Sequence, residues 1–144
     1  MSKKSARIAE MIQSLHGKHF DPHYLGYFEC FNQQLFYEAH DVLEELWLAQ
    51  RGQQNDLFYK GLIQLAGAFV HLQKNRLRPS AALFKLARTN ISQYPARHEG
   101  LNLAAVLSLI EHWLAELEDK NFEINPLQSD NAPHLSVAPA TPTV

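Results

Sequence analysis

Apolar residues recur every three or four positions along most of the chain, which is the spacing of one face of an α-helix. The pattern predicts helices over residues 3–15, 22–31, 35–50, 56–74, 79–93 and 103–117. No segment alternates strictly enough between apolar and polar residues to predict a strand. We therefore expect an all-α fold: a single-domain helical bundle of about five or six helices that occupies residues 1–120.

Residue types at the ends of these stretches indicate where the helices begin and end. Asp21 followed by Pro22 predicts a helix start, with Asp as the N-cap and Pro at the first helical position. Asp56 is placed to cap the helix that follows the polar loop 51–55, and Pro79 is placed to open the next helix. Gly17 is placed to end the first helix.

The chain changes character after the last apolar stripe. From residue 121 on it is polar, has no periodic apolar face and contains four prolines: Pro126, Pro133, Pro139 and Pro142. Segments of this composition cannot bury enough apolar surface to offset their loss of conformational entropy. We expect residues 121–144 to form a disordered, Pro-rich tail that adds little to stability.

Charge and composition narrow the class of protein. The chain has 144 residues, 46% of them hydrophobic, and a formal net charge of −2, so it lacks the basic excess of a nucleic-acid-binding protein. The longest apolar-looking run, 62–72, is too short to span a membrane, and no apolar signal sequence follows the N-terminus. The single cysteine, Cys30, excludes an internal disulfide and suits a cytoplasmic location. We expect no nucleic-acid partner and no membrane association.

The stretch from His40 to Trp47 carries the first candidate functional residues. His40 and Glu44 are one helical turn apart, so both side chains can lie on one face. On a helical wheel both fall at the border of the apolar arc, beside Trp47, and we expect them to be half-buried. The other carboxylates of this helix fall opposite that arc and should form a solvated face without a chemical role: Glu38, Asp41 and Glu45.

The helix predicted over 56–74 is apolar nearly all round, which marks it as the central helix. Its polar residues gather on one stripe: Lys60, Gln64, His71 and, just beyond the helix, Asn75. Small residues flank the stripe (Gly61, Gly67 and Ala68) and would let another helix approach closely. The simplest assembly packs this stripe against His40 and Glu44, which predicts a shared polar pocket.

Three chemistries fit such a pocket. His40, Glu44 and His71 are a suitable ligand set for a divalent metal ion, with water completing its shell. A metal-free acid/base site would use His40 or Glu44 as the catalytic group, and Lys60 would neutralise an anionic substrate. A buried His–Glu–Gln–His network can also serve only to satisfy its own hydrogen bonds and fix the register of the helices.

The same residues carry a resemblance to a known family. The resemblance is carried by two runs, Phe36-Tyr37-Glu38-Ala39-His40-Asp41-Val42-Leu43-Glu44-Glu45-Leu46-Trp47 and Phe58-Tyr59-Lys60-Gly61-Leu62-Ile63-Gln64, and by Asn32, His71 and Asn75. With these residues, about residues 24–118 of the chain resemble the domain of unknown function 309. The family's hallmark is His-x-x-x-Glu-x-x-Trp. The resemblance implies an all-α bundle, a suggested metal site, and a hydrolase label that some members carry. Members commonly have Gly where this chain has Gln34, and Gly-Ala where it has Pro79-Ser80-Ala81-Ala82.

Two functional hypotheses follow. The first is a small helical protein with a metal-binding or acid/base site, and in the metal case a hydrolase whose metal activates water. Trp47, Lys60, Gln64 and Asn75 would line its pocket. The second is a non-enzymatic helical module that presents a groove to a peptide or to another subunit of a homo-oligomer. The sequence alone does not decide between them, and it identifies neither the substrate nor the metal.

Overall fold

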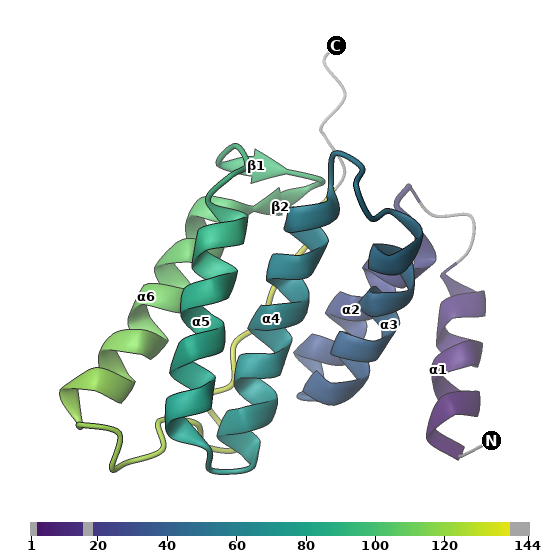
Figure 1. Ribbon diagram of the computed structural model, residues 1–144. Coiled ribbons are helices and arrows are strands. Elements are labelled where there is room, and N and C mark those ends of the chain that lie inside the picture. The colour runs from purple at the N-terminus through teal and green to yellow at the C-terminus, as the bar shows by residue number, and fades with distance from the viewer. Residues whose placement is uncertain (1–2, 16–18, 139–144) are drawn as a thin grey trace.

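The computed structural model describes residues 3–15 and 19–138, and Gly17, predicted to end the first helix, lies outside them. The elements are α1 (Lys3–Ser14), α2 (Pro22–Asn32), α3 (Phe36–Ala49), α4 (Asp56–Gln73), α5 (Leu77–Ile91), β1 (Arg97–His98), β2 (Leu101–Asn102) and α6 (Leu103–Asp119). The prediction of an all-α fold is confirmed, since the only strands in the described part of the chain are β1 and β2, which have two residues each and pair as a small hairpin (Figure 1).

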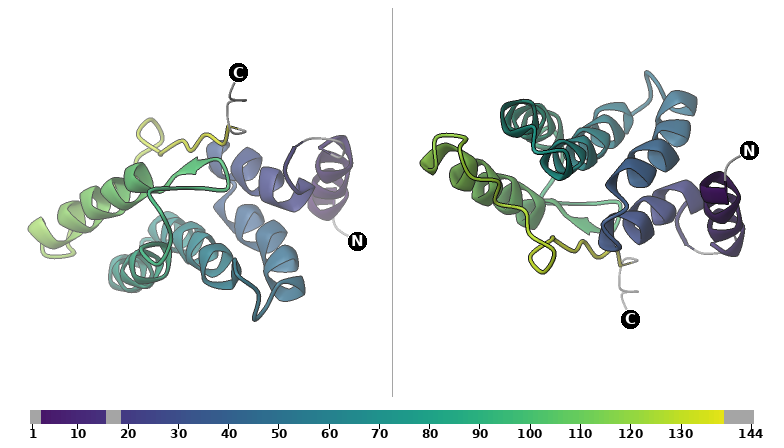
Figure 2. Two further views of the ribbon diagram at one scale, coloured as in Figure 1. Left: turned by 90° about the horizontal axis from the view of Figure 1, so that it is seen from above. Right: turned by 90° about the horizontal axis from the view of Figure 1, so that it is seen from below.

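The helices form two antiparallel hairpins, α2–α3 and α4–α5, placed side by side so that α4 lies between α3 and α5 (Figures 1 and 2). Helix α1 packs on α2 at one edge, and α6 packs on α5 at the other. The strands β1 and β2 lie in the connection between α5 and α6 and pair antiparallel, with Arg97 opposite Asn102 and His98 opposite Leu101. None of the described helices combines the length and apolarity needed to cross a lipid bilayer.

The predicted helix starts are confirmed in one case and wrong in two. The Asp21 carboxylate accepts a hydrogen bond from the backbone N–H of His23, and Pro22 is in the first turn, as predicted. Helix α4 has Asn55 at its N-cap position, and the carboxylate of Asp56 accepts from Trp47 instead of capping the helix. Helix α5 begins at Leu77 rather than at Pro79, which therefore lies within its first turn.

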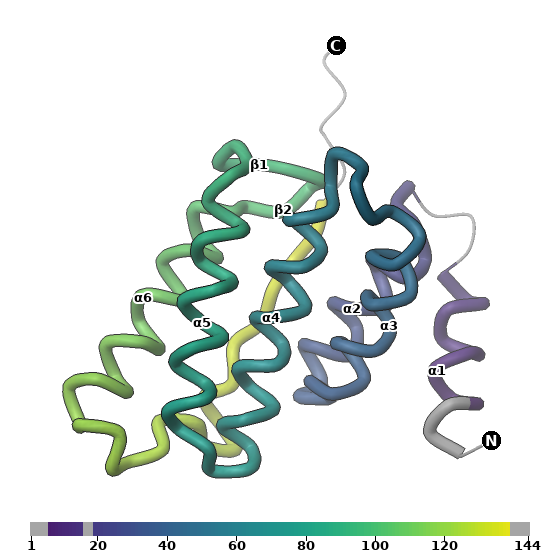
Figure 3. Tube along the Cα trace, viewed as in Figure 1, coloured from purple at the N-terminus to yellow at the C-terminus, as the bar shows by residue number. Residues whose placement is uncertain are grey.

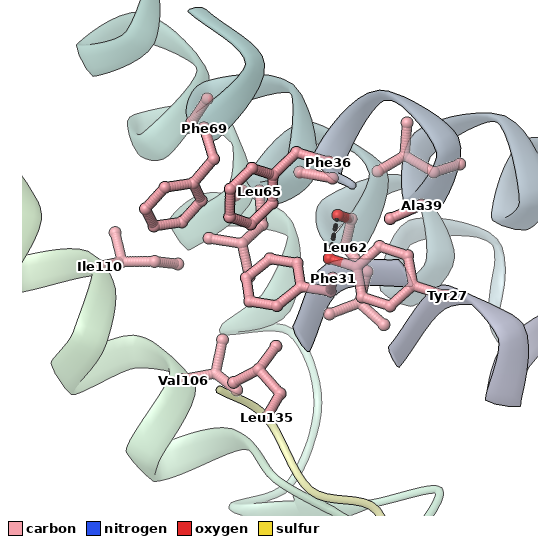
Figure 4. Close-up of a cluster of buried hydrophobic side chains, with 14 of the residues drawn as sticks. Tyr27, Phe31, Phe36, Ala39, Leu62, Leu65, Phe69, Val106, Ile110 and Leu135 are labelled. Carbon is pink, nitrogen blue, oxygen red and sulfur yellow. Dashed lines mark hydrogen bonds between the residues drawn. The ribbon is translucent and has the colours of Figure 1, made fainter. Parts of the chain in front are cut away.

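Aromatic residues fill the core between the two hairpins (Figure 4). The rings of Phe36 and Phe69 stack at 5.0 Å between centroids, joining α3 to α4. The Tyr27 hydroxyl is buried with its ring and donates a hydrogen bond of 2.7 Å to the Leu62 carbonyl. A buried hydroxyl is costly without a partner, so this bond fixes α2 against α4 in a single register.

Three helices end with the same backbone arrangement. After α2, α4 and α6, the residues Gln34, Asn75 and Asn121 adopt positive φ angles of 63°, 57° and 52°. The following N–H then reaches back five residues, as in the bond from Leu35 N to Cys30 O. This is the Schellman arrangement, in which glycine is the favoured residue and asparagine is tolerated. Gln34 is therefore the least favourable of the three residues at its position.

We expect Gln34→Gly to raise the free energy of unfolding by about 1 kcal/mol, because glycine adopts positive φ without steric cost. The Gln34 side chain makes only an exposed bond to the Ser129 carbonyl, so little is lost with it. Urea denaturation measures the change. Gln33→Gly, one residue earlier at φ −97°, is the control and should not stabilise the protein. Equal effects of the two substitutions would contradict the backbone explanation.

The segment after α6 differs from the disordered tail expected for it. Residues 121–138 run back along the bundle and end beside α2 (Figures 2 and 3). Leu135 is only 6% exposed, and its backbone N–H and carbonyl are both bonded to the side chain of Asn32, each at 2.8 Å. Asn125 also donates a hydrogen bond to the Leu72 carbonyl at the end of α4.

The end of this segment extends the small sheet. Val137 forms an isolated antiparallel bridge with Leu101, and the Ala138 N–H donates to the Gly100 carbonyl at 3.0 Å. The expectation of disorder is therefore wrong for residues 121–138, including Pro126 and Pro133. A single buried leucine in an extended segment produces no periodic pattern, so its docking cannot be predicted from the sequence. Pro139 and Pro142 lie outside the described residues.

Candidate functional site

A half-open pocket of about 300 Å³ lies across the middle and end of α4, between α3 and α5. Its lining consists of Tyr37 and His40 from α3, of Ile63, Gln64, Gly67, Val70, His71 and Lys74 from α4 and its C-cap, and of Leu83 from α5. The pocket brings His40, Gln64 and His71 together as predicted. It does not include Glu44, Trp47, Lys60 or Asn75.

His40 is half-buried, with its side chain 33% exposed, and its two ring nitrogens have different surroundings. Nδ1 is 3.3 Å from the Asp41 carboxylate, a hydrogen bond in which the imidazole N–H donates. Nε2 is 3.9 Å from the nearest Glu44 oxygen, beyond hydrogen-bonding distance. The bond to Asp41 favours the tautomer with the proton on Nδ1, which leaves the Nε2 lone pair available.

Asp41 was assigned to the solvated face, and its side chain is indeed 55% exposed. Its contact with His40 was nevertheless missed, because a helical wheel describes faces and not the contacts of neighbouring side chains. Adjacent residues on a helix point about 100° apart, but an imidazole is long enough to reach the carboxylate beside it. The ring of Tyr37 stacks on the ring of His40 at 6.4 Å between centroids.

His71 lines the same pocket, and its Nδ1 atom is buried without a hydrogen-bond partner among the described residues. Desolvation lowers the pKa of His71 below its usual value of 6.5, and the nearby charges of Arg76 and Lys74 lower that pKa further. Adding a proton would place an unsatisfied N–H donor at the buried Nδ1, which is unfavourable. His71 is therefore a neutral imidazole at pH 7, with Nε2 as the nitrogen that can serve the pocket.

The orientation of the third polar group, Gln64, is set by Asn90 of α5. The Asn90 amide donates a hydrogen bond of 2.7 Å to the Gln64 side-chain oxygen. The Gln64 amide nitrogen is thereby left as a donor toward the pocket. Asn90 was not predicted as part of the site, because nothing in the sequence indicates that α5 packs at this face of α4.

The predicted metal-ligand set is not brought together. His40 and His71 share the pocket, but Glu44 lies outside its lining and is 44% exposed. Within residues 3–15 and 19–138, no group of three or more His, Cys, Asp or Glu side chains is arranged to hold a metal ion. The prediction placed Glu44 correctly at the border of the apolar arc of α3, but the pocket opens nearer the start of that helix.

Trp47 joins the ends of α3 and α4 instead of lining the pocket. Its indole N–H donates to the Asp56 carboxylate at 2.7 Å, and the Gly52 N–H donates to the other oxygen at the same distance. The bonds from Gly52 and Trp47 lower the pKa of Asp56. The Arg51 guanidinium lies 5.4 Å from the centre of the Trp47 ring. These contacts fix the loop between the two helices.

Lys60 and Asn75, which were predicted to line the pocket, lie outside its lining, and Lys74 lines it instead. Lys60 is exposed near the start of α4, away from the lining. Asn75 follows α4 at positive φ, where its side-chain oxygen accepts a bond of 3.3 Å from Asn125. Lys74, the residue before it, supplies the ammonium group at the pocket.

The helical-wheel prediction for Glu38 is wrong. It was expected in the solvated face of α3, but it is only 5% exposed. Helix α2 covers this face, as the neighbouring thiol of Cys30 indicates: burial, with the charges of Glu38 and Glu29, raises the pKa of that thiol to about 12. Cys30 is therefore a protonated core residue.

Comparison with known proteins finds a family whose match includes the pocket residues. The model of the family described as "Domain of unknown function (DUF309)" matches residues 24–83. This segment is similar to that family. It extends from α2 into α5, so every residue of the pocket lining, from Tyr37 to Leu83, lies within the matched segment.

A curated relative gives no activity to compare. An uncharacterized protein of Aquifex aeolicus (strain VF5) is 29% identical to this chain over 86 residues, which are 60% of this chain and 26% of the relative. The chain thus corresponds to about a quarter of that longer protein. No solved structure matches the chain.

Proposed function

We propose that this pocket is a metal-free acid/base site for a small organic molecule. The observation that carries the proposal is that His40 and His71, from different helices, line one pocket with different hydrogen-bonding states. His40 would offer the Nε2 lone pair as a base, with Asp41 accepting from its other nitrogen. His71 would stay neutral and donate its Nε2–H to an oxygen of the bound molecule.

Two features of the geometry favour this function over a metal-dependent hydrolase or a purely structural network. Zinc sites in proteins use three or four protein ligands, and the described pocket contributes only two imidazoles. A structural network would have satisfied hydrogen bonds, whereas the Nδ1 atom of His71 has none in the described structure. A catalytic role is one of the recognised reasons for an unsatisfied buried polar atom in a native structure.

The test is an NMR measurement of the imidazole nitrogens of the full chain at pH 7. We expect His40 to carry its proton on Nδ1 and His71 to carry its proton on Nε2. Asp41→Asn should shift His40 toward a mixture of tautomers without altering His71. The proposed function would be contradicted if His71 carried its proton on Nδ1. It would also be contradicted if no small molecule in a fragment screen of mixed charge changed the NMR signals of the two imidazoles.

The lowered pKa of His71 also predicts how stability depends on pH. In the unfolded chain this imidazole takes up its proton near pH 6.5, whereas in the folded chain it does so at lower pH. The unfolded state therefore binds more protons below pH 6.5, so the contribution of neutral His71 is complete above pH 6.5 and is lost as the pH falls below it.

We expect the stability difference between wild type and His71→Gln to be larger at pH 7.5 than at pH 5, because glutamine does not titrate. Urea denaturation at both values measures the difference. His112→Gln is the control, since His112 is exposed on α6. A difference that does not depend on pH would show that His71 is not desolvated.

A further inference from the structure

The polar groups of the pocket wall on α4 are hydrogen-bond donors. Gln64, His71 and Lys74 lie at intervals of seven and three residues, so they share one face of the helix. The Asn90 amide donates to the side-chain oxygen of Gln64, so the NH₂ group of Gln64 remains available as a donor. His71 adds its Nε2–H, and Lys74 adds an ammonium group. A molecule that contacts this wall must therefore supply acceptor oxygens.

The charge of the lining has one sign. Among the described residues that line the pocket, Lys74 is the one permanently charged residue, and none is Asp or Glu. Two carboxylates outside the lining, those of Asp41 and Glu44, flank His40 on α3 and are about half exposed. One ammonium group complements one negative charge, which favours a monoanion over a phosphate dianion.

The remaining wall is apolar. Ile63 and Val70 of α4 and Leu83 of α5 form it, and Gly67 leaves the space that a side chain would fill, with Leu83 the nearest neighbour of an added Cβ at 3.1 Å. The paired rings of Tyr37 and His40 lie on the α3 side. A pocket of about 300 Å³ with this lining suits a small molecule with an aromatic or branched body.

We propose that the ligand of this pocket is a small organic monocarboxylate with an apolar body. Its carboxylate accepts a hydrogen bond from His71 and pairs with Lys74, which is one turn further along, while its body lies against Leu83 and the apolar residues of α4. This inference rests on the proposed function, because it assigns a ligand class to the same pocket. His40 remains free to act on the end of the molecule away from the carboxylate.

The experiment titrates the full chain with benzoate, benzamide and benzylamine, which share one ring and differ in charge, and follows backbone amide shifts by NMR at constant ionic strength. We expect benzoate to bind at least about fivefold more tightly than benzamide, and benzylamine most weakly. Lys74→Met should weaken benzoate about fivefold and leave benzamide unchanged. Lys60→Met, which removes an exposed ammonium from the same helix outside the lining, should change neither.

Gly67→Leu fills the pocket and should abolish the binding of all three compounds. Loss of binding in this variant would show that the compounds bind in the pocket. Three outcomes would overturn the monocarboxylate inference. Benzamide or benzylamine could bind as tightly as benzoate, benzoate could fail to bind, or Lys60→Met and Lys74→Met could have equal effects. If benzylamine or benzamide bound in the pocket and shifted both imidazoles, the proposed function would stand while this inference failed. If benzoate bound and Gly67→Leu left its affinity unchanged, benzoate would bind outside the pocket and the monocarboxylate inference would fail.

Discussion

A chain that ends at Glu123 should be less stable than the full chain by about 4 kcal/mol. Truncation exposes the surface that Leu135 covers in the core between α2 and α6, and burial of one leucine side chain alone contributes about 2–5 kcal/mol (Figure 4). It also removes both hydrogen bonds to the Asn32 amide, each of which contributes about 1 kcal/mol. Urea denaturation followed by circular dichroism measures the loss.

Two point substitutions separate burial from chain length. Leu135→Ala should destabilise the full chain by about 2–4 kcal/mol. His134→Ala, at the exposed neighbouring position, should have an effect within about 0.5 kcal/mol. If Leu135→Ala were as mild as His134→Ala, the segment after α6 would not be docked in solution, and the original expectation of a disordered tail would be restored.

Gly61→Ala should destabilise the protein by about 2 kcal/mol, although alanine is the better helix former. A Cβ atom at position 61 would lie 2.7 Å from Ile91 Cγ1 and 3.4 Å from the Ala87 carbonyl oxygen. Ile91 is fully buried, so neither it nor the backbone of α5 can move without disturbing the core. This overpacking outweighs the gain of about 1 kcal/mol in helix propensity.

Gly67→Ala is the matched control for this substitution. It lies on the same helix, but its added Cβ would meet only the end of the Leu83 side chain, at 3.1 Å. Leu83 is partly exposed beside the pocket and can adjust, so the gain in helix propensity should make this variant as stable as wild type or slightly more stable. Thermal unfolding of the two variants checks the difference. Equal destabilisation would mean that α5 does not approach α4 most closely at Gly61.

These two glycines illustrate how far the sequence predicts the assembly. The polar stripe of α4 and the small residues beside it were found from the sequence, together with the inference that another helix packs closely there. The helix was expected to be α3, but the neighbours of both glycines come from α5. Periodicity gives the faces of a helix, whereas the partner of each face depends on how all the helices share the core.

Within the candidate site, the residues found by sequence are those whose position depends only on helical geometry. His40, Gln64 and His71 share a pocket because each lies at the border of an apolar arc on two helices joined by a short loop. Trp47 and Asn75 were misplaced because their hydrogen-bond partners, Asp56 and Asn125, belong to other segments. Such contacts have no periodic signature.

The sequence by itself determined the approximate bounds of the helices, the all-α fold and the central place of α4, because a repeat of 3.6 residues constrains each helix locally. Only the tertiary structure decided that α2 covers Glu38, that α5 orients Gln64 through Asn90, and that the segment after α6 closes the core. Those outcomes depend on which surfaces meet when the chain folds. Contacts between residues distant in sequence are selected by the packing of the whole core and not by any local pattern.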